Sequence, residues 1–322
     1  MKIRLQKAYR GDCIWIRYGD KEKTNIIIDS GPAGFSRGFK NIIKNITDEG
    51  ENIDLLILTH IDDDHIQGFF KYISNNNNNC QCLKEVWLNG YGMNVYQNNQ
   101  LHSPRNIREV TRLLKYRNIK VVNFVCEGYE VNINGAHLKV ITPTKEAIFD
   151  VAEIIDQYSL HRAREIMDDI DYIYDNLEYS SDHDKKNKAS ISVVITYNGK
   201  RMAFLGDSHA EDVVNGKNKY FKNIKMDLVK ISHHGSKHNT NKELIQCLGS
   251  REFIILTNKV VDKENISTIV RNVNKSKIYC NYNWWNSSNY FTDNDRKKYI
   301  DTGKLEILEK LEIDLLNVGK RG

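Results

Sequence analysis

One segment restricts the possible fold of this chain more than any other. The nearly continuous apolar run Ile53-Asp54-Leu55-Leu56-Ile57-Leu58 is followed by a polar loop and then by a helix-like stretch over residues 66–74. Such a run is typical of a β-strand that is covered on both faces, as in the sheets of α/β proteins. Because functional side chains of α/β folds gather at the carboxyl ends of strands, the loop over residues 59–65 is the first candidate site.

Similar apolar or alternating runs predict strands along most of the chain, with amphipathic helices between them. The predicted strands cover residues 14–16, 25–29, 53–58, 84–88, 119–125, 137–141, 190–197, 201–205, 227–231, 253–256 and 277–281. Short helices are expected around residues 38–46, 66–74 and 105–116. Asn198-Gly199 indicates a two-residue hairpin turn.

Two further regions differ from this alternation. Residues 144–188 are charged, have helical periodicity and contain no strand-like run, so we expect a helical insertion or lid within a single domain that spans residues 1–322. Residues from about 286 to 322 are expected to form a C-terminal extension. The acidic residues of the insertion are interpreted as a solvated face.

The composition narrows the class of protein. The chain has 322 residues, of which 40% are hydrophobic and 28% charged, which is typical of a globular domain with a substantial core. No run of about 18 apolar residues and no signal-peptide pattern occurs, so we expect no membrane segment and a cytoplasmic location. Six scattered cysteines favour reduced thiols over a zinc knuckle, and a net charge of +5 permits an anionic substrate without requiring one.

Histidines and aspartates follow three of the predicted strands. His60, Asp62, Asp64 and His65 lie in the first loop, Gly206-Asp207 follows the second strand, and His233-His234 follows the third. If these strands share a sheet and a direction, their ends meet at one site. Imidazole and carboxylate donors then predict one or two divalent metal ions, zinc or manganese, that activate a water molecule.

Each of these elements also has a simpler interpretation. The run of three aspartates is favourable at the start of a helix and, taken alone, is best explained as a cap. Asp207 after a glycine is typical of a turn, and His233-His234 is compatible with a polar strand end. The two histidines that flank the aspartate run are not explained by capping.

The order of these motifs resembles the metallo-β-lactamase superfamily. The motifs are Gly11-Asp12, Asp29-Ser30-Gly31, His60-Ile61-Asp62-Asp63-Asp64-His65, Gly206-Asp207 and His233-His234-Gly235-Ser236. The superfamily usually has a histidine where this chain has Asp62. A loop with aspartate at that position, followed later by His-His-Gly-Ser, is similar to that of the hydrolase domain of the competence protein ComEC and its stand-alone soluble relatives. The resemblance covers residues 1 to about 285 and implies an αββα sandwich with metal-dependent hydrolysis of a phosphoester.

The resemblance also implies roles for individual residues. His60 and Asp62 are expected to hold one metal ion, Asp64 and His65 a second, and Asp207 to bridge both. Asp64 is further expected to orient the attacking water, and His233 or His234 to act as a ligand or as a proton donor to the leaving group.

Two ligands that the superfamily usually supplies have no clear counterpart. Candidates for a further histidine before Asp207 are His102, His137, His161 and His183, with Asn89 as a weak substitute. No histidine follows His238.

Three functions therefore remain open. The first is a phosphodiesterase or nuclease, in which Trp284 and Trp285 either stack on bases or belong to the core. The second is a hydrolase of a small ester, lactone, thioester or nucleotide. The third is a non-catalytic interaction protein with a degraded site; protein partners and the oligomeric state are not predicted.

Overall fold

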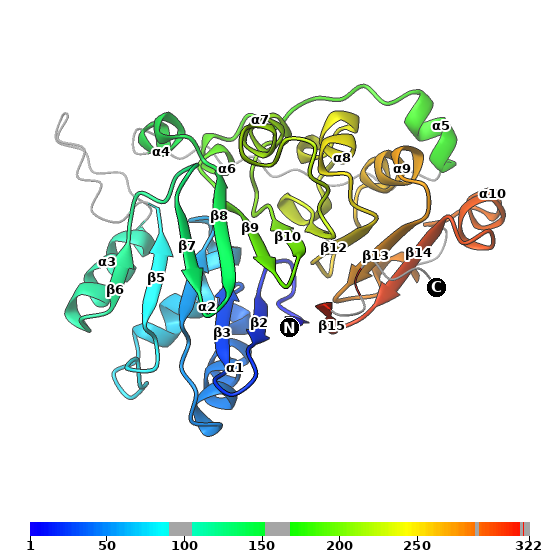
Figure 1. Cartoon of the computed structure of the whole chain (residues 1–322). Helices are drawn as coiled ribbons and strands as arrows, with labels where there is room; N and C mark the ends of the chain where they lie inside the picture. Colours follow the sequence, from blue (N-terminus) through cyan, green and yellow to red (C-terminus); the bar gives the residue numbers. More distant parts are fainter. Residues whose placement is uncertain (90–104, 152–167, 287–289, 316–317, 319–322) are drawn as a thin grey trace.

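The computed structural model describes residues 1–89, 105–151, 168–286, 290–315 and 318. Within these residues, two β-sheets face each other and helices cover both outer faces (Figure 1). The first sheet has the strand order β15-β1-β2-β3-β4-β5-β6 and the second β14-β13-β12-β11-β10-β9-β8-β7. The predicted αββα sandwich is therefore confirmed.

The strands of both sheets are short, and β4 and β11, which lead into two of the site loops, run parallel to both of their neighbours. The strands of the first sheet are β1 Lys2–Leu5, β2 Ile14–Tyr18, β3 Thr24–Ile28, β4 Leu55–Leu58, β5 Glu85–Leu88, β6 Lys120–Val122 and β15 Glu312–Asp314. Those of the second are β7 Glu130–Ile133, β8 Ala136–Thr142, β9 Ser192–Tyr197, β10 Lys200–Phe204, β11 Leu228–Lys230, β12 Glu252–Ile255, β13 Ser276–Cys280 and β14 Leu305–Glu309. β3 to β6 are parallel in sequence order, as are β10 to β14.

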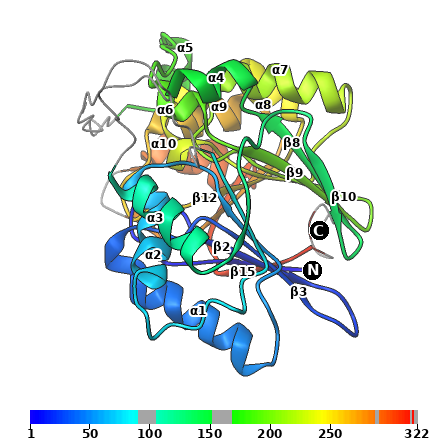
Figure 2. The same ribbon diagram turned by 90° about the vertical axis from the view of Figure 1, so that its left-hand side faces the viewer.

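Helices fill the connections between the parallel strands. The helices of four or more residues are α1 Ser36–Asp48, α2 Asp63–Ile73, α3 Arg105–Tyr116, α4 Lys145–Val151, α5 Ile170–Asp175, α6 Lys185–Lys188, α7 Ala210–Phe221, α8 Lys242–Leu248 and α9 Lys263–Asn272, with a π-helical turn at Arg296–Ile300. Shorter helical turns include α10 Asp293–Asp295, His233–Gly235 and Lys237–Asn239. In Figure 2, α1 to α3 lie on one side of the sheets and α7 to α9 on the other.

Three separate apolar clusters hold these layers together. The cluster between the sheets combines residues such as Ile16 and Leu55 from the first sheet with Val193 and Phe204 from the second. A second cluster packs α1 to α3 on the outer face of the first sheet, and a third packs α7 to α9 on the second. Strands buried on both faces explain why their sequences read as continuous apolar runs.

All eleven predicted strands have a counterpart, but the predicted set is incomplete. It omits β1, β7, β14 and β15, whose sequences carry charged residues at exposed or half-buried positions. These strands lie at or next to sheet edges, where only one face needs apolar side chains. Two of them, β14 and β15, lie in the segment predicted as a C-terminal extension, and β15 pairs with β1.

The segment predicted as a helical insertion contains α4, α5 and α6, while residues 152–167 lie outside the described residues. α5 is attached to α9 by an ion pair between Arg271 and Asp171 of 2.6 Å. That segment contains no described strand, as predicted. Its role as a lid stays a prediction.

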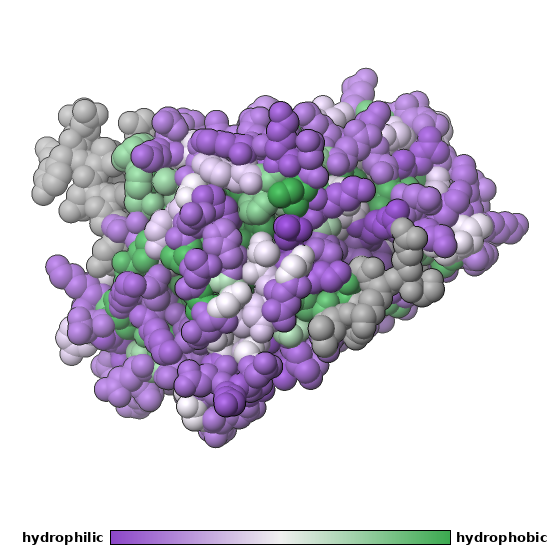
Figure 3. All heavy atoms as spheres, viewed as in Figure 1, coloured by the Kyte–Doolittle hydropathy of each residue, from purple (hydrophilic) through white to green (hydrophobic). Residues whose placement is uncertain are grey.

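The polar and apolar side chains are distributed as in a water-exposed domain. Hydrophilic residues cover most of the face drawn in Figure 3, with smaller hydrophobic areas between them.

Trp284 is buried in the cluster under α9, 5.2 Å from the ring of Tyr290, which favours its core interpretation over base stacking. The six cysteines are free thiols, as expected. Among the described helices, none combines the length and apolarity needed to span a bilayer.

Candidate metal centre

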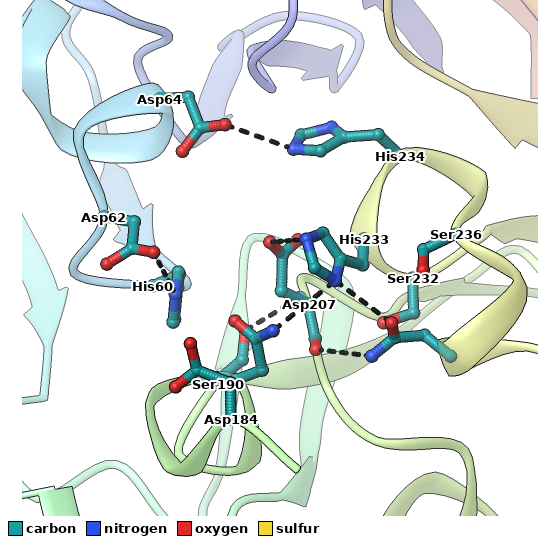
Figure 4. A network of polar contacts seen from close by, with 12 residues as sticks. His60, Asp62, Asp64, Asp184, Ser190, Asp207, Ser232, His233, His234 and Ser236 are labelled. Atoms are coloured by element: carbon teal, nitrogen blue, oxygen red, sulfur yellow. Dashed lines mark hydrogen bonds and ion pairs between the residues drawn. The ribbon is translucent and has the colours of Figure 1, made fainter. Parts of the chain in front are cut away.

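The predicted site residues lie at the carboxyl ends of three strands and come together at one edge of the sandwich. His60 follows β4 and His65 lies in the first turn of α2, whereas Asp207 follows β10 and His233-His234 follow β11. The backbone amide of Ile191, before β9, donates to the carbonyl of Thr59, so the two sheets are joined directly beside the first loop. Figure 4 shows the side chains from both sheets pointing toward one another.

His65 lies at the centre of this arrangement and is fully buried. Its Nε2 atom is 3.2 Å from Oδ2 of Asp207, and its Nδ1 atom is 2.9 Å from Oδ2 of Asp29. Asp29 also accepts hydrogen bonds from the amide and the hydroxyl of Thr59. Asp29 therefore fixes the imidazole ring of His65 so that Nε2 faces Asp207.

His234 and Asp64 complete a cluster around His65. Nε2 of His234 is 3.5 Å from Oδ2 of Asp64, and Nε2 of His65 is 4.0 Å from Oδ1 of Asp64. The three residues Asp64, His65 and His234 each offer a ligand atom, and these atoms lie within 4.8 Å of one another. We refer to Asp64, His65, Asp207 and His234 as the His65 cluster.

His60 and Asp62 form a second, separate contact. Their closest atoms, Nε2 of His60 and Oδ2 of Asp62, are 3.4 Å apart, and Asp62 also binds Nζ of Lys186 at 3.2 Å. We refer to these two residues as the His60 pair. In the part of the chain that the structure describes, no set of three metal-ligating side chains with atoms within 4.8 Å includes either of them.

The helix-cap interpretation of the aspartate run is wrong for Asp62. Asp62 occupies the cap position of α2, but its side chain makes no capping hydrogen bond and turns instead to His60 and Lys186. Asp63 and Asp64 lie in the first turn, where a carboxylate is favoured by the helix dipole.

His233 approaches Asp207 from another direction. Its Nε2 atom is 3.9 Å from Oδ2 of Asp207 (Figure 4). Its Nδ1 atom is 3.0 Å from Oδ1 of Asn239 and 3.5 Å from Oδ2 of Asp182. The ring is 38% exposed, so His233 can reach both the cluster and solvent. These contacts suit a ligand or a proton donor.

Buried polar atoms without hydrogen bonds test whether the site fits a metal ion. Nε2 of His60, Oδ1 of Asp207 and Nε2 of His234 are buried and have no hydrogen-bond partner in the structure. The imidazole rings of His60 and His234 each lie 5.4 Å from that of His65. Because unsatisfied buried donors and acceptors are costly, their gathering around His65 fits a divalent cation with nitrogen and oxygen ligands.

The carboxylates and imidazoles at this centre shift one another's pKa values. Burial raises the pKa of Asp207. The neighbouring histidines His65, His233 and His234 lower this pKa by more than burial raises it, so that it lies well below its usual range. Burial lowers the pKa of His234, yet Asp12 above all raises it to about 10. The pKa of His65 is likewise raised, by Asp207 and Asp29 against the effect of burial. The lowered pKa of Asp207 and the raised pKa values of His65 and His234 mean that opposite charges face one another at this centre.

The backbone at these loops adopts conformations that few residues tolerate. His233 and His234 have φ angles of 47° and 54°, in the left-handed region that costs a non-glycine residue free energy. Gly206 has a φ of 52°, and a Cβ there would lie 2.4 Å from Oγ of Ser190. Ser190 Oγ accepts the amide of Asp207, so this close approach positions the aspartate.

The other sequence candidates do not join the cluster. His183 is exposed, and His137 lies on β8 beside Glu130 at 3.4 Å. Both side-chain atoms of Asn89 bind the backbone of Val125. His102 and His161 lie outside the described residues.

Several residues around the site had no role in the sequence prediction. Asp29 and Asp12 appeared only as parts of short motifs, and Lys186 and Lys230 did not appear at all. A signal for Lys230 existed, since it is a lysine within the apolar run over residues 228–231. The partners of these side chains come from distant segments, which the sequence pattern does not reveal.

The fold and the site define a class: an αββα sandwich with a buried histidine and aspartate centre at the carboxyl edge of its sheets. Residues 7–97 match the family model of the metallo-beta-lactamase superfamily. The match covers the segment that contains β2 to β5 and the loop of His60 and His65, and the sandwich of two sheets flanked by helices agrees with the fold of that superfamily.

Similar solved structures have low sequence identity. PqqB from Methylobacterium extorquens, with bound Zn²⁺, is 10% identical at a TM-score of 0.47, with 98% of this chain and 100% of that chain covered. The metallo-beta-lactamase fold protein YhfI from Bacillus subtilis is 11% identical at a TM-score of 0.46, with 87% and 95% covered. A diphosphatase from the PhnP family is 12% identical at a TM-score of 0.40, with 94% and 84% covered. No curated protein sequence matches the chain.

Proposed function

We propose that this protein is a metal-dependent hydrolase of phosphoesters, and specifically a phosphodiesterase or nuclease related to the ComEC-type hydrolases. The observation that carries the proposal is the His65 cluster, in which Asp64, His65 and His234 offer ligand atoms within 4.8 Å of one another and the buried atoms Nε2 of His234 and Oδ1 of Asp207 have no hydrogen bond. Carboxylate and imidazole ligands together suit zinc or manganese.

Asp64, His65, Asp207 and His234 hold the first ion in this proposal. His60 and Asp62 would hold a second ion, and Asp207, which contacts both His65 and His233, would contribute to both sites. A bound divalent cation supplies Lewis-acid polarisation of water and of a phosphoryl oxygen.

The chain's own residues supply the remaining chemistry. Asp64 lies in the outer part of the cluster, with 23% of its side chain exposed, and can accept a proton from the attacking water. His233 is held by Asn239 and Asp182 and can donate a proton to the leaving oxygen. The ammonium group of Lys186, 25% exposed beside Asp62, favours an anionic substrate.

A small-molecule substrate is the second candidate, supported by a pocket that includes residues of the segment after His234. A pocket of about 240 Å³ is lined by Tyr172, Tyr179, Lys237 and His238, among others. No residue of the His65 cluster lines this pocket, which is linked to the site through His238, the neighbour in sequence of the Asn239 that contacts His233 at 3.0 Å. The volume is at the low end for a ligand pocket.

The test compares substrates on protein that has been stripped of metal and reloaded with Mn²⁺ or Zn²⁺. We expect hydrolysis of bis-p-nitrophenyl phosphate and cleavage of DNA or RNA, with loss of both in Asp64→Ala. Asp63→Asn is the matched control, because Asp63 is the exposed neighbour in the same helical turn and binds Gln67. It should retain activity.

Other outcomes decide between the candidates. Activity on nucleotides, lactones or thioesters without cleavage of polymers favours the small-molecule hydrolase. Less than one bound ion per chain and no activity on any of these substrates overturns the proposal in favour of a non-catalytic protein.

A further inference from the structure

Two opposite charges are buried beneath the metal centre, and the proposed mechanism does not use them. Asp12, in the loop between β1 and β2, and Lys230, at the end of β11, form an ion pair in which each side chain is 2% exposed. Lys230 is flanked in sequence by Val229 and Ile231, which are both completely buried. The pair therefore lies within the apolar interior.

The pair contacts two of the segments that carry the proposed ligands. Oδ1 of Asp12 is 3.1 Å from Nδ1 of His234, and Nζ of Lys230 donates to the carbonyl of Gly206 at 3.2 Å. Gly206 directly precedes Asp207. The loop of Asp12 also packs against the first turn of α2, since a Cβ on Gly11 would lie 2.1 Å from the carbonyl oxygen of Asp64.

Stability does not explain this arrangement. The cost of removing two charges from water often exceeds their mutual attraction, and apolar residues of similar size are frequently as stable or more stable. A second buried ion pair, between Lys263 and Asp295, has no contact with the site and serves as a comparison. Lys263 and Asp295 form an ion pair of 2.7 Å that is equally buried but lies between α9 and α10.

The contacts of Asp12 determine which nitrogen of His234 faces the centre. Nδ1 lies 3.1 Å from two acceptors, Oδ1 of Asp12 and the carbonyl of Leu256, so it carries the proton. The lone pair of a neutral His234 is then on Nε2, which is the buried atom without a hydrogen bond. A carboxylate behind a metal-binding histidine fixes the ring in this way in many metal sites.

Lys230 determines which oxygen atom of Asp12 is available to His234. Asp12, His65 and Asp207 offer ligand atoms within 4.8 Å of one another, so Asp12 is close enough to compete as a ligand. The ammonium group of Lys230 binds its Oδ2 atom and leaves Oδ1 for His234. The lysine thereby keeps Asp12 behind the imidazole and outside the ligand set.

We propose that Asp12 and Lys230 are a positioning pair that presents His234 to the metal ion and anchors the loop of Asp207. The inference rests on the proposed function only in treating His234 and Asp207 as ligands. Neither residue of the pair touches the substrate, so both act through the ligands that they hold.

The test measures metal affinity in Lys230→Met, in Asp12→Asn and in the double variant. Lys263→Met is the matched control, because it removes one partner of the remote buried pair. The readouts are the dissociation constant for Mn²⁺, from competition with a chelating dye, the visible spectrum of the Co²⁺-loaded protein, and the melting temperature without metal.

We expect Lys230→Met and Asp12→Asn to weaken Mn²⁺ binding by about 10- to 100-fold, the usual effect of losing a group that orients a ligand. The Co²⁺ spectrum should shift in both. Lys263→Met should lower the melting temperature and leave the Mn²⁺ dissociation constant and the Co²⁺ spectrum unchanged.

The double variant keeps the inference testable if a single variant fails to fold, because it leaves no unpaired buried charge. Metal affinity and spectra in the double variant that equal those of Lys263→Met would overturn the inference. If the unmodified protein binds metal and loses it in Asp64→Ala while the Asp12 and Lys230 variants bind normally, only this inference fails. If the unmodified protein binds no metal, the proposed function fails as well.

Discussion

The His65 cluster and the His60 pair use the same residue types but are supported differently. Each histidine of the cluster is held from behind by a buried carboxylate, His65 by Asp29 and His234 by Asp12. Asp62 of the His60 pair is 38% exposed and binds a lysine instead. The ligands of the cluster are thus oriented before a cation binds. In the His60 pair, Asp62 must first release the ammonium group of Lys186.

This difference predicts an order of binding. The His65 cluster should bind the first ion tightly, and the His60 pair should bind a second ion more weakly, because Lys186 competes for Asp62. Buried ligands that are already oriented lose less entropy and make stronger electrostatic contacts than exposed ones. The following predictions test this order, from the largest expected effect to the smallest.

Removing His65 should have the largest effect. His65→Ala takes away the central ligand of the cluster, so we expect loss of the tightly bound ion and a decrease in kcat/KM of at least about 10³-fold, as for groups that act as a unit. Metal analysis and hydrolysis of bis-p-nitrophenyl phosphate measure this. A near-normal rate in this variant, with the fold intact by circular dichroism, contradicts the assignment.

Asp207→Asn should weaken both sites at once. Its carboxylate lies 3.2 Å from His65 and 3.9 Å from His233, and an amide is a neutral, weaker ligand. We expect metal affinity to decrease by about 10- to 100-fold, measured by competition with a chelating dye. Full occupancy of two ions in this variant would exclude the bridging role of Asp207.

Lys186→Ala should change only the weaker site. Without the ammonium group, Asp62 is free to bind a second ion, and we expect its affinity to rise by up to about fivefold, since a partly exposed ion pair contributes no more than about 1 kcal/mol. The KM for an anionic substrate should rise in parallel. Lys185→Ala is the control, because Lys185 is exposed on the same short helix; equal effects of both variants would argue against competition for Asp62.

The stabilisation by metal should increase with pH. His234 has a pKa of about 10 in the metal-free fold, above its value of about 6.5 in an unfolded chain. Its contribution to metal-free stability is therefore complete below pH ~6.5 and is lost as the pH rises toward 10.

A bound cation takes the place of that proton. We therefore expect the difference in melting temperature between the metal-loaded and metal-free protein to grow by a few degrees from pH ~6.5 to pH ~9. Differential scanning fluorimetry at fixed metal concentration measures it. A difference that is constant or shrinks over this range would show that His234 does not exchange a proton for metal.

The sequence was sufficient to predict the layers of the fold and the central loop. Strands such as β4 and β11 are buried on both faces, so their apolar runs are visible without a structure. The residues directly after those strands, His60 to His65 and His233-His234, were found for the same reason. Edge strands such as β7 and β14 carry exposed charges and gave no such signal.

The supporting residues could not be predicted because their roles depend on pairing between distant segments. Asp12 and Lys230 are separated by most of the chain and meet only when the loop after β1 reaches the end of β11. The same holds for Asp62, in the loop after β4 of the first sheet, and Lys186, in α6 before β9 of the second sheet. His234 lies 3.5 Å from Asp64, so the ligand set that we propose needs no histidine after His238.

The most direct test is a crystal structure of the protein grown with Mn²⁺, with anomalous diffraction data that locate the ion. Our account predicts a strong anomalous peak in contact with Asp64, His65, Asp207 and His234, and a weaker peak or none beside His60 and Asp62. A peak that is absent from the His65 cluster, or is strongest at the His60 pair, would contradict it.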